Sequence, residues 1–388
     1  MPTISKRAQA IQPFHVMKLL ARARELEAQG KHIIHMEVGE PDFNTPQPIV
    51  DAGMAAIKNG DVHYTPALGL PALREAIAAF YLQQYNVTVS AERIIVTPGA
   101  SGALLLALAA IIEAGQSVLL ADPGYPCNRN FISLLEGKAE LINVDVATHF
   151  QLNDELVEQN WKQNSVAVLL ASPSNPTGTS IPEKNLSDII SFVEKNNGSV
   201  LVDEIYQGLV YDSKPSSALS LSDDVFIINS FSKYFSMTGW RVGWLVVPDE
   251  FVTVIDSLAQ NIFLAAPTPA QYAALAAFKP ETIKILEQRR IEFKARRDYL
   301  LEALPKLGFT IPVTPEGAFY IYANCETITD NSFTFAEQCL EQVGVAVTPG
   351  IDFGTNQAEK YIRFAYTTSL ENLKEAVDRL GRFISNLN

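Results

Sequence analysis

One lysine stands where covalent chemistry with a carbonyl compound could occur. Lys233 lies in the stretch Ser230-Phe-Ser-Lys-Tyr-Phe-Ser-Met-Thr-Gly-Trp-Arg241, just after the apolar run 225–229. A lysine amine forms Schiff bases with aldehydes, and the nearby hydroxyl groups with the Arg241 guanidinium could hold a phosphate. The stretch therefore suits the capture of a phosphorylated aldehyde cofactor. A surface lysine in a serine-rich loop would look the same, so the rest of the chain has to decide.

A carboxylate and a phenol could hold the ring of such a cofactor. Asp203 ends the apolar run 199–202, and a buried carboxylate is costly unless a cation partners it. A protonated ring nitrogen would be such a partner, and Tyr206 could donate a hydrogen bond to a ring oxygen. The alternative is that Asp203 caps the next helix while Tyr206 packs in the core.

A glycine-rich turn offers a second place for the phosphate. Gly99-Ala100-Ser101-Gly102 precedes a predicted helix, where free backbone N–H groups, a hydroxyl and the positive end of the helix dipole attract anions. Many strand–helix turns contain glycine for steric reasons alone, so the turn by itself is a weak signal.

Three single residues complete the candidates. Tyr125, in Asp-Pro-Gly-Tyr-Pro, could stack on a planar ring or simply pack in its loop. Asn175, in Ser-Asn-Pro-Thr-Gly, stands in a sequence typical of turns. Arg363 lies inside the apolar run 361–365. A buried guanidinium needs an anion, which could be a substrate carboxylate or a structural Asp or Glu.

The elements that position these residues follow one rhythm. Apolar runs at 94–97, 117–121, 166–171, 199–202 and 225–229 alternate with helical stretches. This pattern predicts an α/β fold with a mainly parallel sheet and helices on both faces. Each run is followed by one of the polar motifs, and ligands bind at the carboxyl edge of such a sheet. We therefore expect five motifs to meet at that edge.

Arg241 is the exception because it stands at the start of its apolar run, 242–247. It can reach the same edge only if this strand runs antiparallel to its neighbours. The connection from Asn229 to Arg241 is short and contains no clear helix for a parallel crossover. We therefore predict one antiparallel strand in an otherwise parallel sheet.

The rest of the chain predicts a smaller α+β unit. A long charged helix is expected over 280–304, and alternating strands and helices follow from 318 to the end. We predict a large cofactor-binding domain over residues 46–280. Residues 1–45 and 281–388 would form a small domain that includes the N-terminal arm and the long interdomain helix.

Composition limits the class of protein and its partners. The 388 residues are 47% apolar and 19% charged, which suits a soluble globular enzyme, and the net charge of −13 argues against nucleic acid or membrane partners. The longest apolar run, 103–112, is too short to span a bilayer, and no signal peptide is recognisable. Three cysteines without metal-ligand spacing predict free thiols, no metal and a cytoplasmic protein. They are Cys127, Cys325 and Cys339.

Taken together, the motifs resemble the class I and II aminotransferases, pyridoxal-phosphate enzymes of fold type I in the aspartate aminotransferase superfamily. The likeness runs in order from Gly39 to Arg363 and depends on seven stretches occurring at these intervals. The stretches are Tyr-Thr-Pro-Ala-Leu-Gly, Thr-Pro-Gly-Ala-Ser-Gly-Ala-Leu, Asp-Pro-Gly-Tyr-Pro, Pro-Ser-Asn-Pro-Thr-Gly, Asp-Glu-Ile-Tyr, Ser-Phe-Ser-Lys and Met-Thr-Gly-Trp-Arg-Val-Gly. The resemblance implies transfer of an amino group from an L-amino acid to a 2-oxo acid in two half-reactions.

The resemblance also implies roles for single residues. Lys233 would form the internal aldimine with pyridoxal 5'-phosphate and then move the substrate proton. The other cofactor-binding residues would be Tyr64 from a second subunit, Ala100, Ser101, Tyr125, Asn175, Asp203, Tyr206, Ser230 and Arg241. The substrate-binding residues would be Gly39, Tyr125, Asn175 and Arg363. Because the family is dimeric, a homodimer is expected, with Tyr64 completing the partner's site.

Departures from the family pattern bear on the substrate. Tyr125 stands where many aspartate-specific members have tryptophan, and no position clearly supplies a second arginine for a distal carboxylate. Arg129 could do so, or it could lie on the surface. Phe14 and Val16 of the N-terminal arm are candidates for lining the side-chain pocket. These features favour neutral or aromatic amino acids.

Two other functions compete with this one. A cysteine-conjugate β-lyase would use the same cofactor and fold but release pyruvate and ammonia. An aminotransferase-like sensing module of a transcription regulator would need a DNA-binding segment. The N-terminal arm is short for that, and the chain is acidic.

Overall fold

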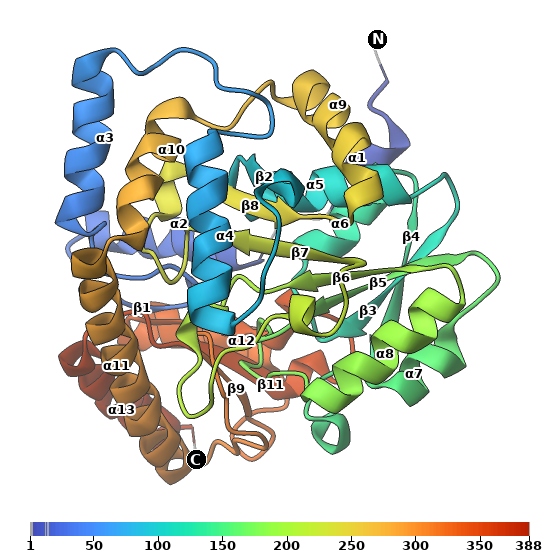
Figure 1. Ribbon diagram of the computed structural model, residues 1–388. Coiled ribbons are helices and arrows are strands. Elements are labelled where there is room, and N and C mark those ends of the chain that lie inside the picture. Colours follow the sequence, from blue (N-terminus) through green and yellow to red (C-terminus); the bar gives the residue numbers. More distant parts are fainter. Residues whose placement is uncertain (1–2, 12, 14, 388) are drawn as a thin grey trace.

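The computed structural model describes residues 3–11, 13 and 15–387 and arranges them around two β-sheets (Figure 1). The strands are β1 (Ile34–Met36), β2 (Ile94–Thr97), β3 (Ser117–Asp122), β4 (Lys138–Asn143), β5 (Ser165–Ala171), β6 (Ser199–Asp203), β7 (Val225–Ser230), β8 (Gly243–Val246), β9 (Tyr320–Asn324), β10 (Val345–Pro349) and β11 (Tyr361–Ala365). The α-helices are α1 (Lys6–Ala10), α2 (His15–Ala28), α3 (Gln47–Asn59), α4 (Pro71–Tyr85), α5 (Gly99–Ile111), α6 (Cys127–Leu134), α7 (Asp154–Asn160), α8 (Glu183–Lys195), α9 (Val252–Ile262), α10 (Thr268–Leu275), α11 (Pro280–Ala303), α12 (Ser332–Gln338) and α13 (Leu370–Ser385).

The larger sheet has seven strands in the order β2-β8-β7-β6-β5-β3-β4. Neighbouring strands pair in parallel except at β8, which is antiparallel to both β2 and β7. The predicted single antiparallel strand is confirmed. It begins at Gly243, however, so Arg241 stands two residues before the strand and not at its first position. Within the described ranges, no helix has the length and apolar character needed to cross a membrane.

Alternating side chains of the larger sheet enter two separate cores. On β6, Val200 and Val202 pack into one core with side chains of α4, α8 and α10, whereas Leu201 packs into the other with α5 and α9. Successive residues of a strand point to opposite faces, so a strand covered on both sides must be apolar throughout. This explains the near-continuous apolar runs and the helices on both faces.

The smaller sheet has the order β1-β10-β11-β9, so its first strand comes from the N-terminal part of the chain. In Figure 1 the blue β1 lies among orange and red strands, and it pairs in parallel with β10. The α+β character predicted for this region is confirmed. The exact domain limits at residues 46 and 280 stay a prediction.

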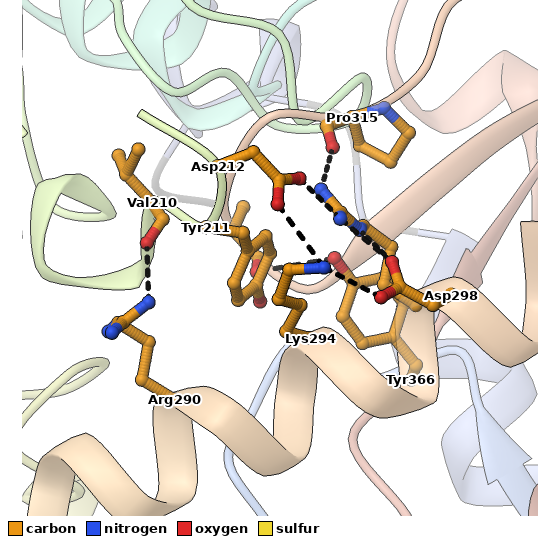
Figure 2. A network of polar contacts seen from close by, with 10 residues as sticks. Val210, Tyr211, Asp212, Arg290, Lys294, Asp298, Pro315 and Tyr366 are labelled. Atoms are coloured by element: carbon orange, nitrogen blue, oxygen red, sulfur yellow. Dashed lines mark hydrogen bonds and ion pairs between the residues drawn. The ribbon is translucent and has the colours of Figure 1, made fainter. Parts of the chain in front are cut away.

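A polar network ties the loop after β6 to α11 and to the segments that flank the smaller sheet (Figure 2). Asp212 of that loop accepts from Arg297 and forms an ion pair with Lys294, both on α11. Arg297 also donates to the backbone oxygen of Pro315, and the Tyr366 hydroxyl donates to that of Ala318. Segments far apart in the sequence are therefore joined at one place.

Candidate active site

One cavity of about 280 Å³ collects nearly all the residues singled out in the sequence. Every predicted cofactor- or substrate-binding residue except Tyr64 lines it. The carboxyl ends of β3, β5, β6 and β7 and the turn after β2 supply one wall, as expected for a parallel sheet. Residues 37–39, Tyr320 and Arg363 supply the opposite wall, from the smaller sheet and its flanks.

Lys233 lies partly buried beyond the end of β7. Its Nζ donates a hydrogen bond to the backbone oxygen of Gly39, 2.6 Å away, which brings the amine against the opposite wall. Burial lowers the pKa of Lys233 to about 8, with Glu40 and Asp203 opposing the shift. A larger share of neutral amine is therefore present near neutral pH, as a nucleophile or a general base requires.

Asp203 is buried at the end of β6. One carboxylate oxygen accepts from the backbone N–H of Ile205 at 3.0 Å. Burial raises the pKa of Asp203 to about 6, although this hydrogen bond and Lys233 favour the charged form. Asp203 caps no α-helix, and Tyr206 itself precedes the next short turn, Gln207–Leu209. The carboxylate is thus placed where a cationic ring nitrogen would relieve its desolvation.

Tyr206 is buried beside Lys233. Its hydroxyl lies 2.8 Å from the hydroxyl of Tyr320, and the Lys233 amine lies 5.9 Å from its ring centroid. Burial raises the pKa of Tyr206 well above its usual value, with the Tyr320 hydroxyl adding to the shift. The phenol therefore stays protonated and able to donate a hydrogen bond.

Arg363 is buried with neutral partners. It donates to Asn175 Oδ1 at 2.8 Å, to the backbone oxygen of Glu37 and to Thr348 Oγ1 at 3.3 Å. No Asp or Glu among the described residues forms an ion pair with it, and its Nε has no hydrogen-bond partner there. Two alternatives were considered for the anion of Arg363. Because no described Asp or Glu takes this place, a ligand carboxylate fits.

The other end of the cavity carries groups that could hold an anion. Ala100 and Ser101 stand in the first turn of α5, where unpaired backbone N–H groups and the helix dipole gather. The Ser230 hydroxyl faces the same space and donates to Ser232 Oγ at 2.9 Å. Two hydroxyl groups therefore lie beside the helix terminus.

The Arg241 guanidinium lies at this same end of the cavity. A Cβ atom on Gly99 would lie 2.6 Å from Arg241 Nη2, so the guanidinium rests directly against the turn before α5. Gly99 has φ +71° and Arg241 φ 55°, both in the left-handed region. At position 99, glycine adopts this conformation without strain. Because it has no Cβ atom, it also leaves the space that the Arg241 guanidinium fills.

The remaining predicted residues lie around this cavity or away from it. Tyr125 lines the wall and is 38% exposed, whereas Tyr64 is 83% exposed and does not reach the cavity of its own chain. Arg129, on α6, lines a separate small hollow and not this cavity. Val16 lines the cavity as predicted, and Phe14 lies outside the described residues.

Sequence reasoning missed several residues of the wall. Met17, Leu104 and Ile205 line the wall as well. Leu104 and Ile205 stand in quoted stretches, but an apolar side chain gives no chemical reason to single it out, and Met17 belongs to no such stretch. Tyr320 lies in the apolar stretch 318–323, where a tyrosine at a strand position suggests only packing. Among the described residues, no group of three His, Cys, Asp or Glu could hold a metal ion.

Comparison with known proteins identifies the family. The family model "Aminotransferase class I and II" matches residues 31–380. The chain belongs to the class I and II aminotransferases. It is 40% identical to the (5-formylfuran-3-yl)methyl phosphate transaminase of Methanocaldococcus jannaschii and 35% identical to the valine–pyruvate aminotransferase of Mycobacterium tuberculosis. These alignments cover 98% of this chain and 100% of the first relative, and 96% and 97% for the second.

The solved structures agree with this assignment. A crystal structure of an aminotransferase from Mycobacterium tuberculosis superposes with a TM-score of 0.96 and 35% identity over the whole of both chains. The protein is thus a pyridoxal-phosphate-dependent aminotransferase with an aspartate aminotransferase fold. Relatives act on different compounds by name, so membership does not fix the substrate.

The residues of the cavity fit pyridoxal phosphate. The turn at Gly99 and the Arg241 guanidinium form a cradle for the phosphate, and the buried Asp203 carboxylate suits a protonated pyridine nitrogen. Lys233 supplies an amine of lowered pKa between these two ends. A ring with a phosphate on one side and an aldehyde on the other matches this set of groups.

Proposed function

We propose that this aminotransferase acts on amino acids with neutral, apolar or aromatic side chains and that Lys233 carries both the cofactor and the substrate proton. The observation behind the proposal is one cavity that holds Lys233, Asp203 and Arg363 together and that the apolar side chains of Val16, Met17 and Leu104 also line. Arg363 would hold the α-carboxylate, with Asn175 orienting the guanidinium.

The chain's own groups would then divide the work. Bound pyridoxal phosphate supplies an electron sink that stabilises the charge developing at the substrate Cα. Asp203 would keep the ring nitrogen protonated, and Tyr206 with Asn175 would donate to the ring oxygen. The Lys233 amine would take the Cα proton as a general base and return it to the carbon on the other side of the transferred nitrogen.

The proposed substrate class follows from the charges along the cavity. The cations that line it among the described residues are Lys233, Arg241 and Arg363, and each already has a proposed partner. A distal carboxylate would therefore meet the apolar side chains of Val16, Met17 and Leu104 without a cation from this chain. Burying a substrate carboxylate there would cost desolvation free energy, whereas a neutral substrate side chain carries no such cost.

The role of Lys233 is tested by borohydride reduction of the holoenzyme, which fixes a Schiff base as a stable amine. We expect the label on Lys233 after peptide mapping, and a colourless Lys233→Ala protein. Lys184, exposed and ion-paired to Asp188, offers a matched control, because Lys184→Ala should keep both colour and label. A label on another lysine would overturn the role.

The substrate class is tested with a panel of amino acids, each with and without 2-oxoglutarate. We expect oxo-acid formation that requires the acceptor, with higher kcat/KM for neutral or aromatic donors than for aspartate. Turnover without any acceptor would instead indicate β-elimination. Equal or higher kcat/KM for aspartate would contradict the proposed substrate class and leave the transaminase assignment intact.

We further propose a homodimer in which Tyr64 reaches the partner's cavity. Tyr64 lies on the segment between α3 and α4, is 83% exposed, and has exposed Val62 beside it. Large apolar side chains that lie exposed near one another are typical of a surface that another chain covers. Met17, which lines the cavity, is also 56% exposed.

A further inference from the structure

A buried tyrosine on the smaller sheet touches Tyr206 and Arg363, to which the proposed function gives separate tasks, and it also lies against Gly39. Tyr320, on β9, is 1% exposed and lines the cavity. Its hydroxyl lies 2.8 Å from that of Tyr206, and its ring centroid lies 4.3 Å from Arg363 Cζ. Its hydroxyl also lies so close to Gly39 that a Cβ there would overlap it.

The ring of Tyr320 holds the Arg363 guanidinium in place. Arg363 pairs with Tyr322 in the β9–β11 register, so Tyr320 is its diagonal neighbour across the strands. The ring of Phe353 lies 4.7 Å from the same Cζ atom. Two aromatic contacts restrict the guanidinium plane, and stacking of this kind is stronger where water is excluded.

The hydroxyl of Tyr320 acts on different groups. The Tyr206 hydroxyl would donate its own proton to the cofactor ring. In the hydrogen bond between the two hydroxyls, Tyr320 would therefore be the donor and Tyr206 the acceptor. Accepting a hydrogen bond makes a hydroxyl a stronger donor to its other partner. The same hydroxyl lies against Gly39 and leaves no room for a side chain there. The backbone oxygen of Gly39 accepts a hydrogen bond from Lys233.

We propose that Tyr320 is a positioning residue that couples the cofactor-facing phenol of Tyr206 to the carboxylate-facing guanidinium of Arg363. This proposal rests on the roles proposed above for Tyr206 and Arg363. The hydroxyl strengthens the hydrogen bond that Tyr206 donates, and the ring orients Arg363. The two parts of one side chain therefore affect two separable properties of the enzyme.

The two parts can be separated by two substitutions. Tyr320→Phe keeps the ring and removes the hydroxyl, so the absorbance titration of the Lys233-linked cofactor should move to higher pH by about 0.5–1 unit, the size of one net hydrogen bond. The KM for the amino acid should change little. Tyr320→Leu removes the ring as well, and we expect KM to rise by about tenfold, as loss of one buried cation–π contact implies.

Tyr322 provides a matched control on the same strand. It is buried, its hydroxyl has no hydrogen-bond partner among the described residues, and it does not line the cavity. Tyr322→Phe should leave the absorbance titration and KM unchanged. If it shifts the titration as much as Tyr320→Phe does, the effect is general packing and the proposal fails.

A double-mutant cycle tests the coupling itself. Tyr206→Phe should shift the same titration, and adding Tyr320→Phe should then produce no further shift, because the hydroxyl acts through Tyr206. Additive shifts would overturn the proposal. A wild-type protein without any Lys233-linked absorbance would instead overturn the proposed function, so the two failures are distinguishable.

Discussion

Asp203 shows how a residue placed for chemistry can weaken the fold that holds it. Asp203 is 8% exposed, and its carboxylate accepts one backbone hydrogen bond, from Ile205. Burial raises its pKa to about 6, above the usual value of 3.8. The folded apoprotein therefore holds a proton at pH values where the unfolded chain has lost it.

This gives a pH-dependent prediction for the apoprotein. Because the folded pKa is the higher one, the free energy of unfolding falls as the pH rises from about 4 to 6, by roughly 3 kcal/mol from this group. Asp203→Asn should remove that fall, so the variant apoprotein should be more stable than wild type at pH 7. Urea unfolding of both apoproteins across this range measures the difference.

The same substitution should have the opposite effect on activity. Asparagine cannot keep a ring nitrogen protonated, so kcat should fall by about 10² or more, as for other lost electrostatic contacts in active sites. Asp188, on the exposed surface of α8 with a single lysine partner, gives a control variant, Asp188→Asn, that should keep kcat. A stabilised variant with full activity would contradict the role of Asp203.

Some residues of the candidate site could be predicted from the sequence, and others could not. Asp203, Asn175 and Lys233 follow apolar runs, and the rule that strand ends meet at one edge is enough to bring them together. Tyr320 comes from the other sheet, whose position relative to the first depends on packing between distant segments. No local pattern could have placed it against Tyr206 and Gly39.

At the scale of elements, β1 fastens the N-terminal segment to the smaller sheet. Within this strand, His35 contacts Glu37 at 2.7 Å and Glu27 of α2 at 3.1 Å. The Glu37 carboxylate raises the pKa of His35 to about 9. The contact between His35 and Glu37 also holds residue 37 in place, and the backbone oxygen of this residue accepts a hydrogen bond from Arg363.

This cluster predicts a loss of stability at alkaline pH. The folded pKa of His35 lies above its unfolded value of 6.5, so its contribution is complete below pH 6.5 and disappears as the pH rises through about 9. Because His35 is partly exposed, we expect about 1–2 kcal/mol. His35→Gln should lower the free energy of unfolding at pH 6 and have little effect at pH 10. An equal loss at both pH values would contradict a charge-based role.

The network of Figure 2 makes a second prediction for elements. Arg297 is 3% exposed, and its guanidinium lies 4.9 Å from the Tyr211 ring and donates to the Pro315 backbone oxygen at 2.9 Å. Arg297→Met keeps the apolar volume but leaves that oxygen unpaired, and should cost about 2–3 kcal/mol. Asp212 is well exposed, so Asp212→Asn should cost no more than about 1 kcal/mol. Chemical denaturation compares the two, and equal losses would contradict this division.

Some strands can be predicted from the sequence and others cannot, for a physical reason. Strands buried on both faces, such as β6 and β7, appear as continuous apolar runs and were predicted. The edge strand β4 was not predicted, because the polar residues Lys138, Glu140 and Asn143 interrupt its apolar pattern. The antiparallel direction of β8 could be inferred because Arg241 had to reach a known edge and because the connection from Asn229 is too short for a parallel crossover.

At the scale of the whole molecule, the cavity lies where the larger sheet meets the smaller one. Lys233 extends from the larger sheet, and Arg363 from the smaller, so the proposed cofactor end and the proposed carboxylate end of the site belong to different sheets. A change in the angle between them would alter the site as a unit. One predicted residue, Tyr64, remains outside the cavity of its own chain.

Mixing two inactive variants tests where Tyr64 acts. In a hybrid of Lys233→Ala and Tyr64→Ala subunits, the second subunit keeps Lys233 and would receive Tyr64 from the first, so one of its two sites is complete. Random pairing would then restore about a quarter of wild-type activity, as expected for a two-fold symmetric dimer. Lys233→Ala mixed with Arg363→Ala is the control, because both residues line one cavity of one chain, and the hybrid should stay inactive. If Tyr64 served its own cavity, neither site of the hybrid would be complete. The absence of restored activity in a verified hybrid would therefore exclude the shared site.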